Sequence, residues 1–234
     1  MTPPLNQERR PFGAIPPRAT PAGITRKPSL VPFDASSARF FAFWVGSVIL
    51  ANIAAVSAAT LLAAESAATV LLVALAEGAC LGLLQWKLLG GRRPDLARYW
   101  VYATLAGTVI ARALQFVAET GPLLTLSYRW PVAAQFGMAV LAGTAVGTIM
   151  AVPQFWLLRP RVRHAAAWLA ARAAGAAVAF VWLYAAQHML GASEAPLAII
   201  FLTLLTVFAL AGAAAGAIEA TVMSRLLAEE AATS

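Results

Sequence analysis

Three apolar segments of this sequence carry the same small-residue pattern: two glycines four positions apart, then a larger side chain three positions later. The first glycines of successive copies lie 65 and 69 residues apart. A membrane-spanning helix needs about 20 apolar residues, so this period fits a hairpin of two spans with its loops. We therefore predict six transmembrane helices arranged as three pseudo-repeated hairpins. The three copies are Gly78-Gly82-Gln85, Gly143-Gly147-Met150 and Gly212-Gly216-Glu219.

Composition favours the same class, an all-α integral membrane protein. Hydrophobic residues make up 61% of the chain and charged residues 12%, and a compact water-facing globule of that composition would be insoluble. The apolar segments also lack the alternation of period two that barrel strands show. Hydropathy and turn residues place the helices at residues 39–64, 67–89, 98–118, 131–158, 165–190 and 196–226.

The amino-terminal end differs sharply from the rest of the chain. Eight of the fourteen prolines fall within residues 3–32, among five basic residues, and such a segment neither propagates a helix nor fills a core. It is either a tail held near anionic lipid or a tether lying in a groove of a neighbouring subunit. We predict a basic arm over residues 1–38, a six-helix domain over 39–228 and a short tail over 229–234.

The distribution of basic residues predicts the orientation. With both termini in the cytoplasm, fourteen Lys and Arg residues lie inside and only Arg129 lies outside, a strong positive-inside bias. We therefore expect the inner (cytoplasmic) membrane of a bacterium, with anionic lipid at the inner surface. The pI of about 10.5 follows from this bias and indicates no nucleic-acid partner. The tryptophans fit interfacial anchors, with Trp44, Trp86, Trp100, Trp156 and Trp168 inside and Trp130 and Trp182 outside.

The repeat continues beyond the glycines. Gln85 is followed by a basic loop and Trp100, and Gln154 is followed by a basic loop and Trp168, with a four-residue insertion ahead of Gln154. This run resembles that of uncharacterised small bacterial multi-pass membrane proteins with repeated GxxxGxxQW hairpins. The resemblance covers residues 78–107 well, 143–175 with the insertion and 212–227 poorly. It implies a fold and no activity.

The glycines predict close helix contacts. Lipid tails provide no hydrophobic force between helices, so small residues four apart let two backbones approach and gain dispersion contacts. We expect Gly78, Gly82, Gly143, Gly147, Gly212 and Gly216 to pack the second, fourth and sixth helices around a pseudo-threefold axis. The alternative is that one or more of these faces docks another protein.

Charged residues within the spans are the best functional candidates, because a charge at mid-bilayer costs about 3 kcal/mol or more unless it is paired or hydrated. Counted at ~1.5 Å per residue, Arg172 and Glu219 lie at equal depth and are the favoured pair. Glu77 and Arg112 differ by ~6 Å in depth and match less well. Thr108, Arg112, Gln115 and Glu119 form one stripe. The buried seam Glu77, Arg112, Gln115, Arg172 and Glu219 either fixes helix register or lines a solute or proton path.

Catalytic chemistry finds little support in the sequence, and we predict no enzyme, metal or cofactor. His164 and His188 fall at opposite surfaces and cannot share a metal; a pigment or haem held by His188 alone is the alternative. We expect a non-catalytic accessory or scaffold subunit, in contact with lipid and other membrane subunits. The alternative is a small-solute or ion transporter that uses the buried seam.

Overall fold

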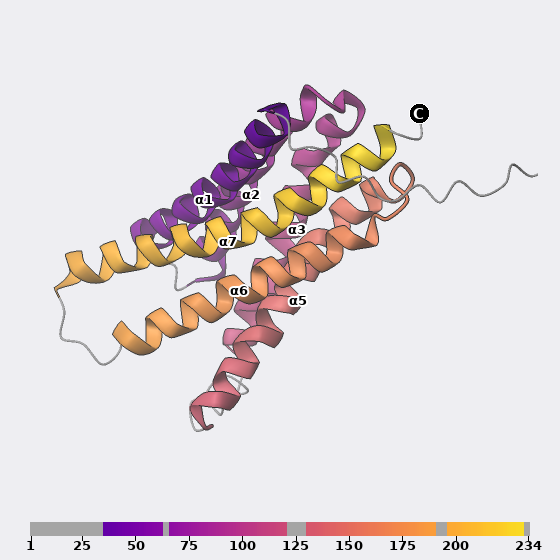
Figure 1. Cartoon of the computed structure of the whole chain (residues 1–234). Helices are drawn as coiled ribbons and strands as arrows, with labels where there is room; N and C mark the ends of the chain where they lie inside the picture. Colours follow the sequence, from indigo (N-terminus) through magenta and orange to yellow (C-terminus); the bar gives the residue numbers. More distant parts are fainter. Residues whose placement is uncertain (1–34, 63–65, 121–129, 191–195, 232–234) are drawn as a thin grey trace, which may run out of the picture. The chain divides into compact units, whose positions relative to one another are not determined.

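The computed structural model describes residues 35–62, 66–120, 130–190 and 196–231 of the chain. Within these ranges it contains six helices that are long and apolar enough to cross a membrane. The all-α, multi-pass class is therefore confirmed by length and composition (Figure 1). The helices are α1 (Ala35–Leu62), α2 (Ala67–Gly90), α3 (Pro94–Glu119), α5 (Val132–Leu158), α6 (Ala166–Leu190) and α7 (Leu197–Ala231).

Local sequence explains several helix ends. Ser66 and Thr69 form a reciprocal capping box at the start of α2, and Pro94 occupies the first turn of α3, where a missing N–H costs nothing. Most of the predicted arm and the last residues of the predicted tail lie outside the described residues. Residues 35–38 and 229–231, which the sequence placed in the arm and the tail, belong to α1 and α7.

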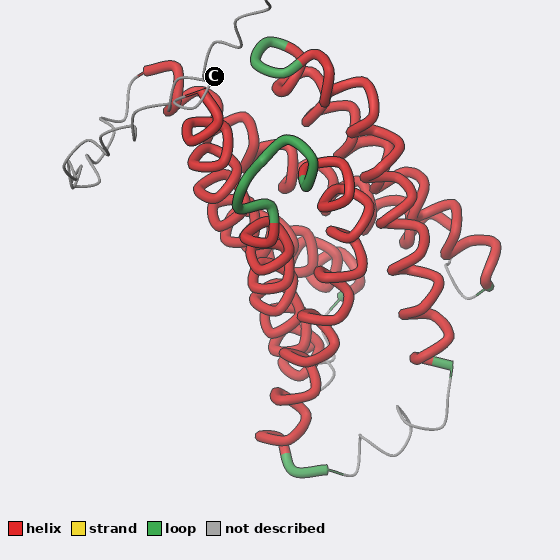
Figure 2. Tube along the Cα trace, turned by 90° about the vertical axis from the view of Figure 1, so that its right-hand side faces the viewer, coloured by secondary structure: helices red, strands yellow, loops and turns green. Residues whose placement is uncertain are grey.

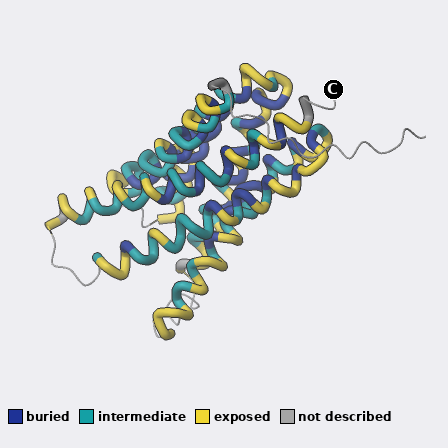
Figure 3. Tube along the Cα trace, viewed as in Figure 1, coloured by how far each residue is buried: buried dark blue, intermediate teal, exposed yellow. Residues whose placement is uncertain are grey.

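The six described helices form a closed ring. Each helix packs on two others in the order α1, α2, α3, α5, α6, α7, and α7 returns to α1. The tube view of Figure 2 shows the same bundle from the side. Consecutive helices are therefore neighbours, as short loops predict, and the contact between α7 and α1 closes the ring. In Figure 3 the buried stretches lie where helices face one another and the exposed stretches lie on the outside.

The glycines of the three motifs do make close helix contacts, but not with one another. Gly78 and Gly82 lie against α3, and an added Cβ on Gly78 would come within 3.1 Å of the Leu105 backbone. The pair Gly143 and Gly147 lies against α6 in the same way, and the pair Gly212 and Gly216 lies against α1. The expected packing within the chain is therefore present, but the glycines of α2, α5 and α7 face α3, α6 and α1 and not one another.

Two further glycines sit between hairpins. Gly107 of α3 faces the Met150 backbone of α5, and Gly175 of α6 faces Ala215 of α7. Small residues thus allow close approach both within each pair of helices and between pairs. Five of the six contacts in the ring therefore include a glycine, and the contact between α1 and α2 is the exception among the described residues.

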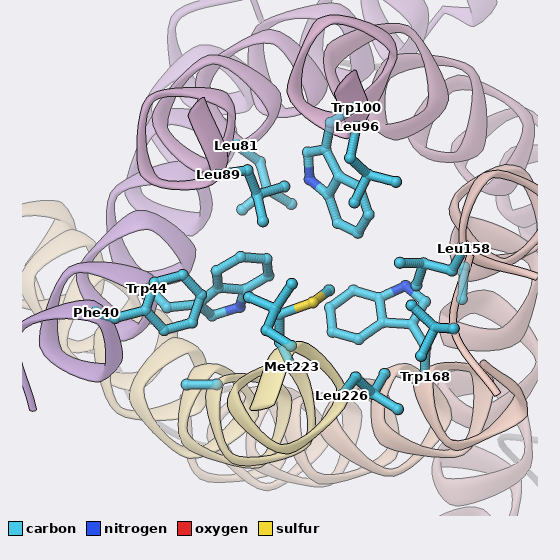
Figure 4. Packing of buried hydrophobic residues seen from close by; sticks show 14 of the residues in the cluster. Phe40, Trp44, Leu81, Leu89, Leu96, Trp100, Leu158, Trp168, Met223 and Leu226 are labelled. Carbon is cyan, nitrogen blue, oxygen red and sulfur yellow. The ribbon is translucent and has the colours of Figure 1, made fainter. Parts of the chain in front are cut away.

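A cluster of tryptophans closes one end of the bundle. Trp44, Trp100 and Trp168 are fully buried, and their ring centroids lie 5.7 to 6.1 Å apart. Figure 4 shows them around Met223, with Leu89 and Leu158 nearby. These three tryptophans are therefore core residues, which corrects the prediction that they are interfacial anchors. Trp86 and Trp156 do remain exposed.

Candidate functional site

Two of the buried tryptophans are held by glutamines from the neighbouring helix. Trp100 Nε1 donates to Gln85 Oε1 at 2.8 Å, and Trp168 Nε1 donates to Gln154 Oε1 at 2.8 Å. Gln154 Nε2 also donates to Thr104 Oγ1 at 2.8 Å, which joins α5 to α3. The polar residues of the repeat thus fix the indoles in place.

The third tryptophan meets a carboxylate instead. Trp44 of α1 interacts with Glu219 of α7. Glu219 follows Gly216 by three positions, which is the place that Gln85 has after Gly82. Even so, Trp44 Nε1 and Glu219 Oε2 have no hydrogen-bond partner of normal geometry among the described residues. A carboxylate with spare acceptor capacity therefore lies directly above the tryptophan cluster.

The glutamine contacts give a first stability prediction. Replacing Gln154 with leucine leaves the Trp168 N–H and the Thr104 hydroxyl without this partner, and an orphaned buried polar group costs about 1–3 kcal/mol. We expect Gln154→Leu to lower the thermal unfolding temperature of the detergent-extracted protein. Adding Trp168→Phe removes one orphan and should recover part of the loss. A single variant as stable as the parent would contradict this account.

Arg172 and Glu219 form a buried ion pair between α6 and α7. Arg172 Nη1 donates to Glu219 Oε1 at 2.7 Å, and both side chains are almost fully buried. Arg172 Nη2 lies 3.8 Å from the Met150 sulfur of α5. The pairing expected from equal depth is present, because a helix converts residue count directly into depth.

Arg112 and Glu77 form a second pair between α3 and α2. Arg112 Nε donates to Glu77 Oε2 at 2.8 Å, and its Nη1 donates to Gln115 Oε1 at 3.0 Å. The Arg112 side chain is 25% exposed, against 7% for Glu77. Its long side chain spans the mismatch in depth. Thr108 bonds back to its own helix at Thr104 O, and the Glu119 side chain lies outside what the structure describes.

One interior cavity brings both pairs together. Its volume is about 90 Å³, and its lining includes Glu77, Arg112, Arg172 and Glu219. A water needs about 10–15 Å³ measured in this way, so the cavity has room for several. Asn52 and Met150 add polar or polarizable atoms, and apolar residues complete the wall, among them Phe180, Leu183 and Phe208.

A larger vestibule of about 470 Å³ adjoins the cavity. Arg112, Leu183 and Phe208 line both spaces. The vestibule wall comes from residues 55–60, 70–73, 112–116, 183–187 and 204–208, and it includes Gln115.

The two ends of this polar interior differ. Arg172 lies one helical turn from Trp168, and Glu219 lies one turn from the fully buried Met223. The tryptophan cluster therefore forms the floor of the cavity on that side, while the vestibule lies on the other.

Sequence reasoning found all four charged residues of the cavity but missed other parts of the site. Asn52 and the vestibule carry no motif of their own, and Met150, although it belongs to the second glycine motif, was not predicted to line a site. Trp44 could have been recognised, since Ala51 follows it by seven residues as Gly107 follows Trp100. The same spacing separates Trp168 from Gly175, so the sequence matches α1 to α3 and α6, the helices that carry the other two buried tryptophans.

The histidines lie away from this interior. His164 Nδ1 is 2.9 Å from Glu229 Oε2, and the His188 ring stacks on Tyr184 with a centroid distance of 5.7 Å. Within the described ranges, no group of three or more His, Cys, Asp or Glu residues could hold a metal ion. Haem or pigment ligation by His188 stays a hypothesis.

Comparison with known proteins gives no family for this chain: no family model matches it, and no curated protein or solved structure matches it significantly. The resemblance based on the repeated hairpins therefore stays a prediction. The function has to be inferred from the cavity and its charges.

Proposed function

We propose that this protein is a multi-pass membrane transporter for a small polar solute, which binds in the cavity between the two ion pairs. The observation that carries the proposal is the convergence of two ion pairs, with three of the four side chains buried and Arg112 partly exposed, on one cavity beside a larger vestibule. A pump or carrier needs a hydrated polar site within its span, and intramembrane charges are the usual markers of such a site.

Stability alone gives a weak reason for this arrangement. Two charges removed from water recover their desolvation cost only with good geometry, and apolar residues of the same size often do as well. A chain selected only to pack would gain nothing from a cavity between the pairs, since voids in a core cost stability. The combination of charge and space therefore favours solute binding over a purely structural seam.

The accessory-subunit function predicted from the sequence depended largely on the three glycine faces. All six motif glycines face neighbouring helices of the same chain, so these faces are not free to dock a partner. Contacts with other subunits would have to use the lipid-facing surface or the amino-terminal arm. The glycines therefore no longer favour the accessory-subunit function.

The proposal also includes the repeat arrangement of the helices and their orientation in the membrane. Three hairpin copies surround the cavity, and α1 completes the copy that begins on α7. Both termini face the cytoplasm of a bacterial cell, the basic loops contact anionic lipid, and the vestibule opens to the opposite side. The charge bias supports this orientation, and the similar settings of Trp44, Trp100 and Trp168 support the three copies.

Cysteine accessibility tests the transport function without knowledge of the solute. A single cysteine replaces Ala179, which lines the cavity, in a Cys80→Ala background. Impermeant thiol reagents are then applied to right-side-out and to inverted vesicles. We expect labelling from both sides, faster from the vestibule side, because a transporter exposes its site alternately. Ala174→Cys, at an exposed position of the same helix, is the control and should react poorly in lipid.

Each other outcome counts against the proposal. Labelling of Ala179→Cys from the vestibule side alone would indicate a one-sided binding protein, and no labelling would indicate a dry core. Native mass spectrometry in mild detergent is the complementary measurement. Stoichiometric co-purification with unrelated chains would restore the accessory-subunit function.

A further inference from the structure

Two of the side chains that line the cavity have opposite charges and incomplete hydrogen bonding. Arg172 and Glu219 both line the cavity, and Arg172 Nε and Glu219 Oε2 are buried without a hydrogen-bond partner of normal geometry in the described part of the chain. Buried polar atoms are rarely left unpaired. A guest that supplies an acceptor to Arg172 and a donor to Glu219 would satisfy both.

Trp44 does not remove this requirement. Its indole interacts with the Glu219 carboxylate without a hydrogen bond of normal geometry. A carboxylate has about four lone-pair positions, and Arg172 occupies one of them. Glu219 therefore retains acceptor capacity for a cationic donor even beside the indole.

The formal charges that line the cavity sum to zero, since Glu77 and Glu219 balance Arg112 and Arg172. A guest with a net charge would leave that charge uncompensated inside an apolar bundle, which is costly. A neutral guest without charges would pair poorly with the guanidinium and the carboxylate. A zwitterion keeps the balance and engages both signs.

The volume limits the size of the guest. At about 15 Å³ for each water-sized position, a cavity of about 90 Å³ admits roughly six heavy atoms. We infer, on the basis of the transport function proposed above, that the solute is a small zwitterion with a carboxylate and a protonated amine, of about the size of alanine. The carboxylate faces Arg172 and the ammonium group faces Glu219.

Equilibrium dialysis of the full-length protein in detergent tests the inference with radiolabelled L-alanine as the probe. We expect saturable binding that glycine and β-alanine compete for. Propionate, ethylammonium and propionamide are no larger than alanine, so they fit the same space, but they carry one charge or none, and each should compete at least tenfold less well. In parallel, each of the three non-zwitterions is tested for direct binding.

The outcomes separate the inference from the proposed function. Saturable binding of propionate, ethylammonium or propionamide, without binding of any zwitterion, would overturn the zwitterion and leave a solute-binding cavity. Binding of none of these solutes, up to about 10 mM, would overturn the inference. It would leave the transport function to the independent test with Ala179→Cys.

A variant pair on one helix tests the role of Glu219. Glu219→Gln keeps the shape of the side chain but removes the charge that pairs with the ammonium group, so alanine binding should weaken at least tenfold. Glu229 lies on the same helix as Glu219, and its contact with His164 is exposed. The Glu229→Gln variant should therefore bind alanine as the parent does. Equal affinity in both variants would overturn the assignment of Glu219. If Glu219→Gln fails to fold, the competition series on the unmodified protein still decides the question.

Discussion

Replacing either Arg172 or Glu219 with alanine will destabilise the protein by about 3–5 kcal/mol, because the remaining member becomes an uncompensated charge in the core. The two side chains are joined at 2.7 Å and are 6% and 3% exposed, so bulk water does not reach the survivor and the few waters that fit the cavity replace its partner only in part. Thermal unfolding of the detergent-extracted protein, followed by circular dichroism, measures the loss. This is the largest effect we expect from any single substitution described here.

The double variant Arg172→Leu with Glu219→Leu is the decisive comparison. Removing both charges leaves no unpaired ion, and apolar replacement of a buried pair is often close to neutral. We therefore expect the double variant to recover most of the lost stability. Glu229→Ala is the matched control on α7; its contact with His164 is exposed, so the change should stay within about 0.5 kcal/mol. Two stable single variants would show that the pair contributes little.

The double variant also separates structure from function. If it folds but no longer binds or moves solute, the charges serve the cavity and not the fold. If the double variant folds and retains full activity, the ion pair is a structural feature and the solute site lies elsewhere. The single variants cannot make this distinction, since loss of folding and loss of function coincide in them.

Gly147→Ala will also destabilise the protein strongly. An added Cβ would meet the Arg172 carbonyl oxygen and the Ala176 side chain of α6, and backbone cannot move aside as a flexible side chain can. Overpacking of this kind costs about 1–3 kcal/mol, occasionally more, which outweighs the gain of up to about 1 kcal/mol from higher helix propensity. We expect lower thermal stability of the extracted protein.

Gly137→Ala is the matched control, because it lies on the same helix and an added Cβ meets nothing within 4 Å. Only the propensity gain then remains, so this variant should be as stable as the parent or slightly more stable. Equal destabilisation by both alanines would show that α5 and α6 do not make the close contact described here.

The two predictions are linked through Arg172. Its carbonyl lies against Gly147, while its guanidinium binds Glu219. The close approach of α5 and α6 therefore sets the depth and direction from which Arg172 reaches the cavity. We expect Gly147→Ala to weaken solute binding as well as stability, because the displaced helix would carry the guanidinium with it.

The sequence by itself determined the features that depend on distance along a helix. Hydropathy located all six helices within a few residues, because the length needed to cross a bilayer is a local property. Depth counting found the partner of Arg172, since each residue advances a helix by a fixed rise. The sequence also identified all four charged residues of the cavity, because a charged residue within an apolar span stands out without any structure.

Only the tertiary structure decided which way each side chain faces and what it meets there. Trp44, Trp100 and Trp168 lie near helix ends, where interfacial anchors are also expected. The orientation of each helix about its own axis places these side chains in the core. The glycines contact neighbouring helices and not one another because small residues specify close approach without specifying a partner. The cavity could not be predicted, because an empty volume arises from the packing of six helices together and no single segment encodes it.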